Sequence, residues 1–234
     1  FGMLSCAAAG NDLLFDESLL EQGSKFSTKI WNAFRLVKGW EVDAALNQPE
    51  SAKIAIDWLE SKMSETLIFV SDNFSKYRLS DSLMSTYKLI WNDFCSSYLE
   101  CVKPAYQKPI DAITLKITIH YFEKLLKMLH PFMPFVTEEL WQNIEERKAG
   151  ETIMLLDFPK ATQVNEGLLN DFSYTNSVIS EIRTIRKSKN IPNKDQIALM
   201  VKKNEAINPA LDTIISKLTN LSALTYVDDK VDGA

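Results

Sequence analysis

The stretch that decides the fold, "KFSTKIWNAFRLVKGW", covers residues 25–40 and carries four positive charges, no negative charge, two tryptophans and two phenylalanines. Its apolar residues recur at steps of three and four, the spacing with which an amphipathic helix buries one face. This apolar stripe consists of Phe26, Ile30, Ala33, Phe34 and Val37. The stretch therefore predicts a long helix with one apolar side and one basic side that also bears an aromatic ring.

The basic side of this helix has the composition that RNA recognition needs. Lysine and arginine neutralise phosphates, aromatic rings stack on unpaired bases, and amides hydrogen-bond to base edges. Trp31 and Arg35 are four residues apart, close enough to stack on each other. A solvated face with Trp31 packed on a neighbouring helix is the alternative. The candidate RNA-binding residues here are Lys25, Lys29, Trp31, Asn32, Arg35 and Lys38.

A second basic cluster follows much later in the chain. Arg183, Arg186, Lys187 and Lys189 lie within seven residues without an acid between them. Helical spacing places Arg183 and Lys187 opposite an apolar face that contains Val178, Ile182 and Ile185, which makes them further candidates for phosphate contact. Such a run is often only a solvated face. Two basic patches on a chain of net charge −5 nevertheless favour a directed polyanion partner.

The composition is that of an ordinary globular protein. The chain has 234 residues, enough for one large or two small domains, and only seven glycines and eight prolines, which favours helices. The three cysteines form no CxxC pair, so we expect a reducing, cytoplasmic compartment. No signal peptide and no apolar run of ~20 residues is present, so no membrane partner is expected. Because the sequence opens without Met inside an apolar phrase, we interpret it as a piece of a longer protein.

The first 150 residues read as helices. Residues 1–24 predict a short helix, a turn at Gly10-Asn11 and a second helix start at residues 15–17. Four further amphipathic helices after that of residues 25–40 predict a bundle with short connections. Their expected ranges are 51–73, 80–103, 109–129 and, after Pro134, 135–147.

The pattern changes after Gly150. The stretches "TIMLLDF" (152–158), "QIALMVKK" (196–203) and "SALTYV" (222–227) read as short strands. A helix that ends at Asn190 and another that starts at Asn208-Pro209 lie between them. The predicted fold class is mainly α, a helix bundle over residues 25–150 followed by a small mixed α/β subdomain over 151–234.

We find no catalytic or metal-binding constellation. His120 and His130 are ten residues apart with no ligand-spaced partner, and His130 before Pro131 reads as a residue that bonds the carbonyls at a helix end. The phrase "KMSET" at residues 62–66 resembles a phosphate-stabilising KMSKS loop, but Glu65 replaces its second lysine and would repel phosphate. The phrase also falls in the middle of a predicted helix, so we interpret it as a coincidence.

Several phrases together resemble one family, the anticodon-binding region of class I aminoacyl-tRNA synthetases, and within it most closely the valyl-tRNA synthetases. They are "KIWNAFRLV" (29–37), "LIWNDFCSSYLECVKP" (89–104), "LHPFMPFVTEELWQNI" (129–144) and "IRTIRKSKNIP" (182–192). The phrase "AGNDLLFDE" (9–17) resembles the stem-contact region of that family, which we assign to residues 1–24. The family's terminal coiled-coil arm has no counterpart in this sequence.

The resemblance implies a tRNA-binding piece of a longer ligase. The full enzyme would join valine to its tRNA with ATP and Mg, while this piece would hold the anticodon arm of valine tRNA and need no cofactor. The first long helix of the family faces the anticodon stem and loop, and Lys29, Asn32 and Arg35 stand in the matching phrase. Neither DNA nor a membrane is an implied partner. Trp91, Phe94, Tyr98, His130, Pro131, Pro134 and Trp141 read as core and helix-end residues.

Two alternatives stay open. The same piece could belong to an isoleucyl- or leucyl-tRNA synthetase, although "HPFMPF" favours the valyl family. The chain could also be a helical protein-interaction module without an RNA role. The sequence indicates neither the oligomeric state nor which residue contacts which base.

Overall fold

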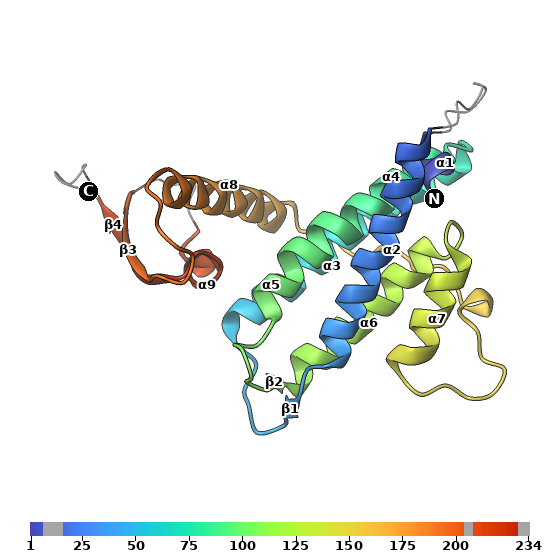
Figure 1. Ribbon diagram of the computed structural model, residues 1–234, viewed down its shortest axis with the longest axis horizontal. Helices are drawn as coiled ribbons and strands as arrows, with labels where there is room; N and C mark the ends of the chain where they lie inside the picture. The colour runs from blue at the N-terminus through green and yellow to red at the C-terminus, as the bar shows by residue number, and fades with distance from the viewer. Residues whose placement is uncertain (7–15, 204–207, 229–234) are drawn as a thin grey trace. The chain divides into compact units, whose positions relative to one another are not determined.

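A computed structural model describes residues 1–6, 16–203 and 208–228 of the chain (Figure 1). Helices make up most of it, and the strands form only two two-stranded sheets. The mainly α fold class with a small α/β part is therefore confirmed. The turn expected at Gly10-Asn11 and most of the "AGNDLLFDE" phrase lie outside the described residues.

The stretch quoted first forms the C-terminal part of α2 (Glu17–Lys38), which follows a short α1 (Gly2–Cys6). The Asp16 side chain caps α2 by accepting a hydrogen bond from the Ser18 backbone N–H at 2.8 Å, which confirms the start expected near residues 15–17. All five residues of the apolar stripe are buried.

The next helix, α3 (Glu50–Ser75), confirms the range expected from the sequence. It contains "KMSET" in its interior, so this phrase lies on a regular helix, as expected. The Lys62 ammonium pairs with Glu65 of the same helix at 2.6 Å. The interior of a regular helix is not a mobile phosphate-binding loop, which supports reading the phrase as a coincidence.

The third predicted helix is three consecutive segments: α4 (Leu79–Lys88), the π-helical η1 (Leu89–Tyr98) and α5 (Leu99–Val102). The range was predicted, but the π-helical middle was not. Within it, the Ser96 hydroxyl donates to the Trp91 carbonyl at 2.8 Å. The wide turns of a π-helix are rare and occur frequently at functional sites.

Two more helices complete the bundle, α6 (Ala112–Leu129) and α7 (Pro134–Ile144). Asp111 caps α6 by accepting from the Thr114 N–H at 2.8 Å. Two short strands, β1 (Val42–Asp43) and β2 (Ile110–Asp111), pair in parallel and tie the chain after α2 to the chain before α6. Stacked aromatic rings fill the core, with Phe94 between Tyr98 and Phe122 at centroid distances of 5.7 and 5.4 Å.

The strand predicted over residues 152–158 is wrong. Residues Ile153–Leu155 form a single 3₁₀ turn, η2, which the Thr152 hydroxyl caps at the Met154 N–H. Met154 and Leu155 are 69% and 78% exposed. A short apolar run does not by itself distinguish a strand from other structure, and here no ladder partner is present among the described residues.

The second half contains α8 (Glu166–Ser188), β3 (Ile197–Lys202), the 3₁₀ turn η3 (Pro209–Leu211), α9 (Asp212–Thr219) and β4 (Leu221–Val227). Both remaining strand predictions and the helix start at Asn208-Pro209 are confirmed. Strands β3 and β4 are parallel, with α9 as the connection between them. This is the small mixed unit that the sequence indicates.

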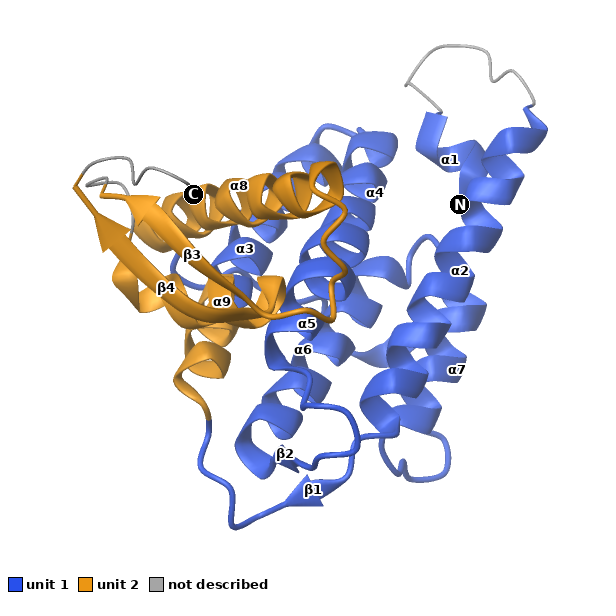
Figure 2. Cartoon of the chain, turned by 60° about the vertical axis from the view of Figure 1, so that its left-hand side comes forward, with its two compact units in different colours: residues 1–48, 59–164 blue, residues 49–58, 165–234 orange. Residues whose placement is uncertain are grey.

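Contacts divide the chain into two compact units (Figure 2). The first contains Phe1–Gln48 and Leu59–Val164, and the second contains Pro49–Trp58 and Asn165–Ala234. In the second unit the Trp58 and Phe172 rings stack 4.0 Å apart, so the start of α3 packs with α8. This division differs in two respects from the boundary predicted near residue 150. The first unit continues to Val164, and the second unit also includes Pro49–Trp58, which contain the first turns of α3.

Candidate nucleic-acid interface

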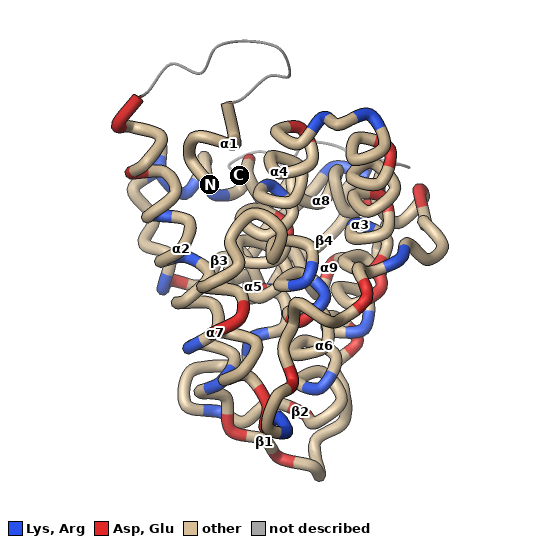
Figure 3. The backbone as a smooth tube through the Cα atoms, turned by 90° about the vertical axis from the view of Figure 1, so that its right-hand side faces the viewer, with Lys and Arg blue, Asp and Glu red and all other residues tan. Residues whose placement is uncertain are grey.

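The basic side of α2 is exposed, as its pattern requires, but it is not free of acids. Blue segments follow α2 in Figure 3, with red segments near its N-terminal end. Lys25 pairs with Glu21 one turn earlier at 2.8 Å, and both side chains are about two-thirds exposed. Such an exposed pair contributes little energy, so phosphate can displace Glu21 from Lys25.

Lys29 is half-buried between two elements. Its ammonium lies over the Trp91 ring at 5.1 Å from the centroid and donates to the Ser96 hydroxyl at 3.3 Å. The π-helical segment therefore orients Lys29 from outside α2. Sequence reasoning missed this contact, because it placed Trp91 only in the core and the two residues lie far apart along the chain.

Trp31, Asn32 and Arg35 are exposed on α2. The Trp31 ring is 39% exposed and contacts the Phe34 ring at a centroid distance of 5.8 Å. The Trp31 ring thus packs on Phe34 and not on the Arg35 guanidinium, with which we expected it to stack. The Asn32 amide and the Arg35 guanidinium therefore lie at the surface, on the same helix as the partly exposed Trp31 ring.

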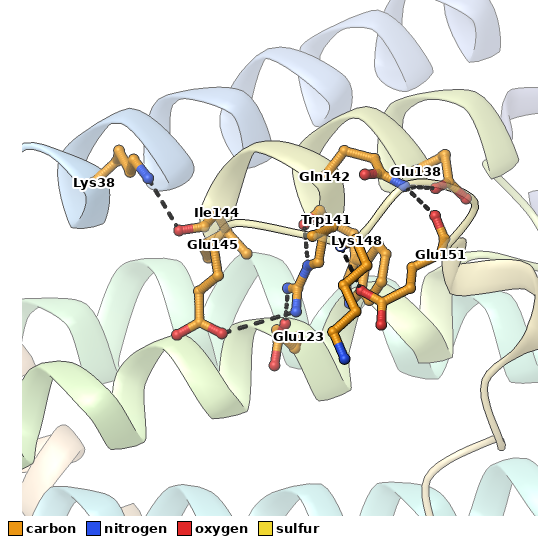
Figure 4. A network of polar contacts seen from close by, with 10 residues as sticks. Lys38, Glu123, Glu138, Trp141, Gln142, Ile144, Glu145, Lys148 and Glu151 are labelled. Atoms are coloured by element: carbon orange, nitrogen blue, oxygen red, sulfur yellow. Dashed lines mark hydrogen bonds and ion pairs between the residues drawn. The ribbon is translucent and has the colours of Figure 1, made fainter.

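Lys38 has a structural contact that its sequence position does not reveal. Its ammonium donates to the Ile144 carbonyl at the end of α7, at 3.1 Å (Figure 4). Next to that carbonyl, Arg147 pairs with Glu123, donates to the Trp141 carbonyl and lies over the Trp141 ring at 3.9 Å. Glu138, Gln142 and Glu151 continue this network. Lys38 therefore helps to join α2 to α7, and it is a weaker candidate for phosphate contact than Lys25.

The second basic cluster divides into exposed and buried members. Arg183 and Lys187 are exposed on α8, and Arg183 also reaches the Leu218 carbonyl at 3.5 Å. Ile185, expected on the apolar face, is 48% exposed, and Arg186 occupies the buried position in its place. Arg186 donates to the carbonyls of Pro192, Asp195, Thr219 and Asn220 at 2.8–3.1 Å. The sequence pattern around Arg186 does not reveal that the carbonyls of this loop and helix end bind it.

An open groove of about 540 Å³ separates α3 from α4 and η1. Lys62, Glu65 and Asp93 are among its lining residues. Burial raises the pKa of Asp93 from 3.8 to about 6, with Glu65 adding to the rise and Lys62 opposing it. The mixture of two lysines and three acids gives this groove no net preference for an anion.

His130 has a hydrogen-bond partner within the bundle. The His130 ring hydrogen-bonds to the Thr137 hydroxyl at 2.7 Å, which joins the end of α6 to α7. Its partner is therefore a hydroxyl and not the helix-end carbonyls that we expected. No cluster of three or more His, Cys, Asp or Glu side chains suited to a metal occurs in the described part of the chain.

The comparison with known protein families agrees with the resemblance. Residues 57–202 match the family described as the anticodon-binding domain of tRNA ligase, which is more than half of the chain. The chain belongs to this family. The matched residues begin in α3 and end in β3, so the match includes parts of both compact units.

Three similar proteins carry the same name. The whole chain is 52% identical over 233 residues to the valine–tRNA ligase of Christiangramia forsetii and 48% identical over 235 residues to that of Parabacteroides distasonis. A more distant valine–tRNA ligase, from Pseudothermotoga lettingae, is 36% identical over 83% of the chain. The anticodon-binding domain described here spans about a quarter of the length of these relatives (27%, 26% and 22%). None of its described helices is both long and apolar enough to cross a bilayer.

Proposed function

We propose that this chain holds the anticodon arm of valine tRNA as part of a longer valine–tRNA ligase. The observation that carries the proposal is the identity of about half of all residues, across the whole chain, with proteins named valine–tRNA ligase. The exposed side of α2 supports it, because it offers ammonium and guanidinium groups to phosphates, an amide to a base edge and an indole for stacking.

In this proposal the chain contributes binding and not chemistry. Lys25, Lys29, Arg183 and Lys187 neutralise phosphates, while Asn32, Arg35 and Trp31 meet bases. Lys38 stabilises the join between α2 and α7. The parent enzyme, in the cytoplasm, would activate valine with ATP and Mg and transfer it to the tRNA held here. Correct anticodon contacts would favour the productive position of the acceptor end.

A comparison of charging tests the amino-acid assignment. The full-length protein is assayed with valine, isoleucine and leucine, each with its own tRNA and with an anticodon-swapped version of it. We expect charging with valine, reduced by the anticodon swap. Charging with isoleucine or leucine instead would assign the chain to one of the other two ligases. Equal binding of tRNA and an unrelated polyanion, unaffected by substitutions on α2, would favour a protein-interaction module.

A further inference from the structure

Lys29 differs from Lys25 and Lys38 of the same helix in the groups that hold its ammonium. Lys25 pairs with a carboxylate of the preceding turn, and Lys38 donates to a backbone carbonyl. Lys29 instead lies over the Trp91 ring and donates to the Ser96 hydroxyl. Among the described residues, no ion pair includes Lys29. Its ammonium is therefore held in place while it keeps its full charge.

The direction of the hydrogen bonds shows how Ser96 acts on this charge. The Ser96 hydroxyl donates its own proton to the Trp91 carbonyl at 2.8 Å, so its oxygen accepts from the Lys29 ammonium at 3.3 Å. The face of the Trp91 ring is likewise electron-rich. Burial raises the pKa of the nearby Cys95 thiol from 9.0 to about 12, so this thiol stays neutral. The groups that hold or approach the ammonium are thus neutral and do not cancel its charge.

The π-helical form of η1 brings the two partners of Lys29 to one side. In an α-helix, residues five apart differ by about 140° around the axis, so Trp91 and Ser96 would face different directions. A π-helix closes its turns with i→i+5 hydrogen bonds, which return a residue to the side of the residue five positions earlier. The hydrogen bond between the Ser96 side chain and the Trp91 carbonyl spans this interval of five. The wide turn therefore lets ring and hydroxyl reach the same ammonium.

The Trp91 ring is itself fixed by two other rings. Its centroid lies 6.3 Å from that of Phe26 on α2 and 5.6 Å from that of Tyr87 on α4. Aromatic pairs at such distances add to the stability that burial provides. A lysine loses much side-chain entropy when a ligand orders it. Because Lys29 is already ordered on a fixed ring, a ligand that binds its ammonium bears less of this cost.

We propose that Trp91 and Ser96 are positioning residues, which hold the Lys29 ammonium in place for one phosphate of the bound tRNA. An ammonium has three N–H donors, so the bond to Ser96 leaves donors for a phosphate oxygen on the side that the Trp91 ring does not cover. The inference rests on the proposed function. It adds η1, which lies outside α2, to the tRNA interface and gives its π-helical form a role in binding.

Ser96→Ala tests the positioning contact with little change in packing, because the Ser96 side chain is exposed. In the full-length protein we expect this variant to bind valine tRNA about threefold more weakly, since the ammonium loses a hydrogen bond that orders it. Ser96→Thr keeps the hydroxyl and should restore the affinity. Ser97→Ala is the matched control, because Ser97 is the next residue along the chain and does not hydrogen-bond to Lys29.

Trp91→Leu removes the ring beneath the ammonium. We expect it to weaken binding of valine tRNA by about two- to fivefold, the effect of one exposed cation–π contact. This variant also loses ring contacts with Phe26 and Tyr87, so its melting temperature should fall. A loss of affinity in this variant therefore needs a readout that a purely structural role would not change.

A Lys29→Ala background supplies this readout. If Trp91 and Ser96 act through Lys29, then adding Ser96→Ala or Trp91→Leu to Lys29→Ala should cause no further loss of tRNA affinity. The salt dependence of binding is the second measurement. One phosphate contact contributes ~0.7–0.9 to the slope of log affinity against log salt, so Ser96→Ala should shift this slope toward that of Lys29→Ala.

The outcomes separate this proposal from the proposed function. Unchanged affinity of Ser96→Ala and Trp91→Leu, or equal losses with and without Lys29, would overturn the positioning role. Unchanged tRNA affinity of Lys29→Ala would overturn it as well. In each of these cases the proposed function stands as long as the original protein prefers valine tRNA to an unrelated polyanion. Absence of that preference would instead contradict the proposed function.

Discussion

Arg186 is 2% exposed and contacts four backbone carbonyls, which is an unusual position for a cation with no recorded carboxylate partner. Carbonyl oxygens supply the negative ends of four dipoles, so the guanidinium exchanges water for a fixed polar shell. In doing so it connects α8 to the loop before β3 and to the end of α9. A basic residue in a basic run thus has a structural role, whereas Lys187 beside it is exposed.

We expect Arg186→Met to destabilise the second unit by about 3 kcal/mol, because four carbonyls would lose a charged donor and one of them belongs to the buried Thr219. Lys187→Ala, one residue away and exposed, should leave the melting temperature nearly unchanged and weaken tRNA binding mildly for every tRNA. Thermal melts and tRNA titrations of both variants check this. Equal melting temperatures for the two variants would show that the carbonyl shell is not important for stability.

Asp93 predicts a dependence of stability on pH. Burial raises its pKa from 3.8 to about 6, so the folded chain keeps the proton after the unfolded chain has lost it. Its contribution to stability therefore falls as the pH rises from about 4 to about 6 and is constant above that. The shift corresponds to roughly 3 kcal/mol at most.

The variant Asp93→Asn removes this titration. We expect it to be more stable than the original protein at pH 7 and to approach it near pH 4, as denaturant midpoints at the two pH values would measure. A stability difference that is the same at pH 4 and pH 7 would mean that Asp93 ionises normally in the folded chain.

At the scale of one element, the two faces of α2 have different roles: one packs in the core, and the other is exposed. Phe34→Ala should cost about 3–5 kcal/mol in the free energy of unfolding, because it leaves a cavity at a position that is only 9% exposed. Asn32→Ala, on the opposite face, serves as the folding control and should melt as the original protein does. Similar losses from both substitutions would contradict the division of the helix.

The exposed face of α2 predicts two kinds of binding defect. Lys25→Ala and Lys29→Ala should weaken binding of every tRNA and lower the salt dependence by ~0.7–0.9 for each lost phosphate contact. Arg35→Ala should instead narrow the difference between valine tRNA and its anticodon-swapped version, by roughly 1–3 kcal/mol if the guanidinium contacts a base edge. Titrations across salt concentration with both tRNAs measure the two effects. Unchanged affinity and discrimination in all three variants would mean that this face is only solvated.

Elements differ in how far the sequence determines them. The apolar stripe of α2 is a local pattern, so the sequence predicted all five of its buried residues. The π-helical form of η1 was not predicted, because its buried residues Ile90, Phe94 and Tyr98 are four apart, a spacing that fits an α-helix as well as a wider turn. The strand predicted over residues 152–158 was wrong for a different reason. A strand needs a partner strand, and an apolar run does not show whether one exists. Contacts of Lys29 and Lys38 with distant segments likewise required the tertiary structure.

The whole molecule combines a net charge of −5 with local positive surfaces, so its binding depends on where charges lie more than on their sum. The exposed basic residues of α2 belong to the first unit, and those of α8 belong to the second. None of them is associated with a metal cluster among residues 1–6, 16–203 and 208–228. In the proposed function, this chain positions the tRNA and the rest of the enzyme activates the valine.

This division of roles gives a prediction for the chain as it stands. Valine-dependent exchange between ATP and pyrophosphate requires an ATP-binding site. The phrase "KMSET", which resembles a phosphate-stabilising loop, lies inside α3 with Lys62 paired to Glu65. We therefore expect the purified 234-residue chain to show no valine-dependent exchange, while the full-length protein shows it. A control with the full-length Arg35→Ala variant should retain exchange, because the proposed scheme assigns Arg35 to tRNA binding and not to the activation of valine. Robust exchange by the 234-residue chain alone would place catalytic groups within it and would overturn the assignment of this part of the enzyme to tRNA binding.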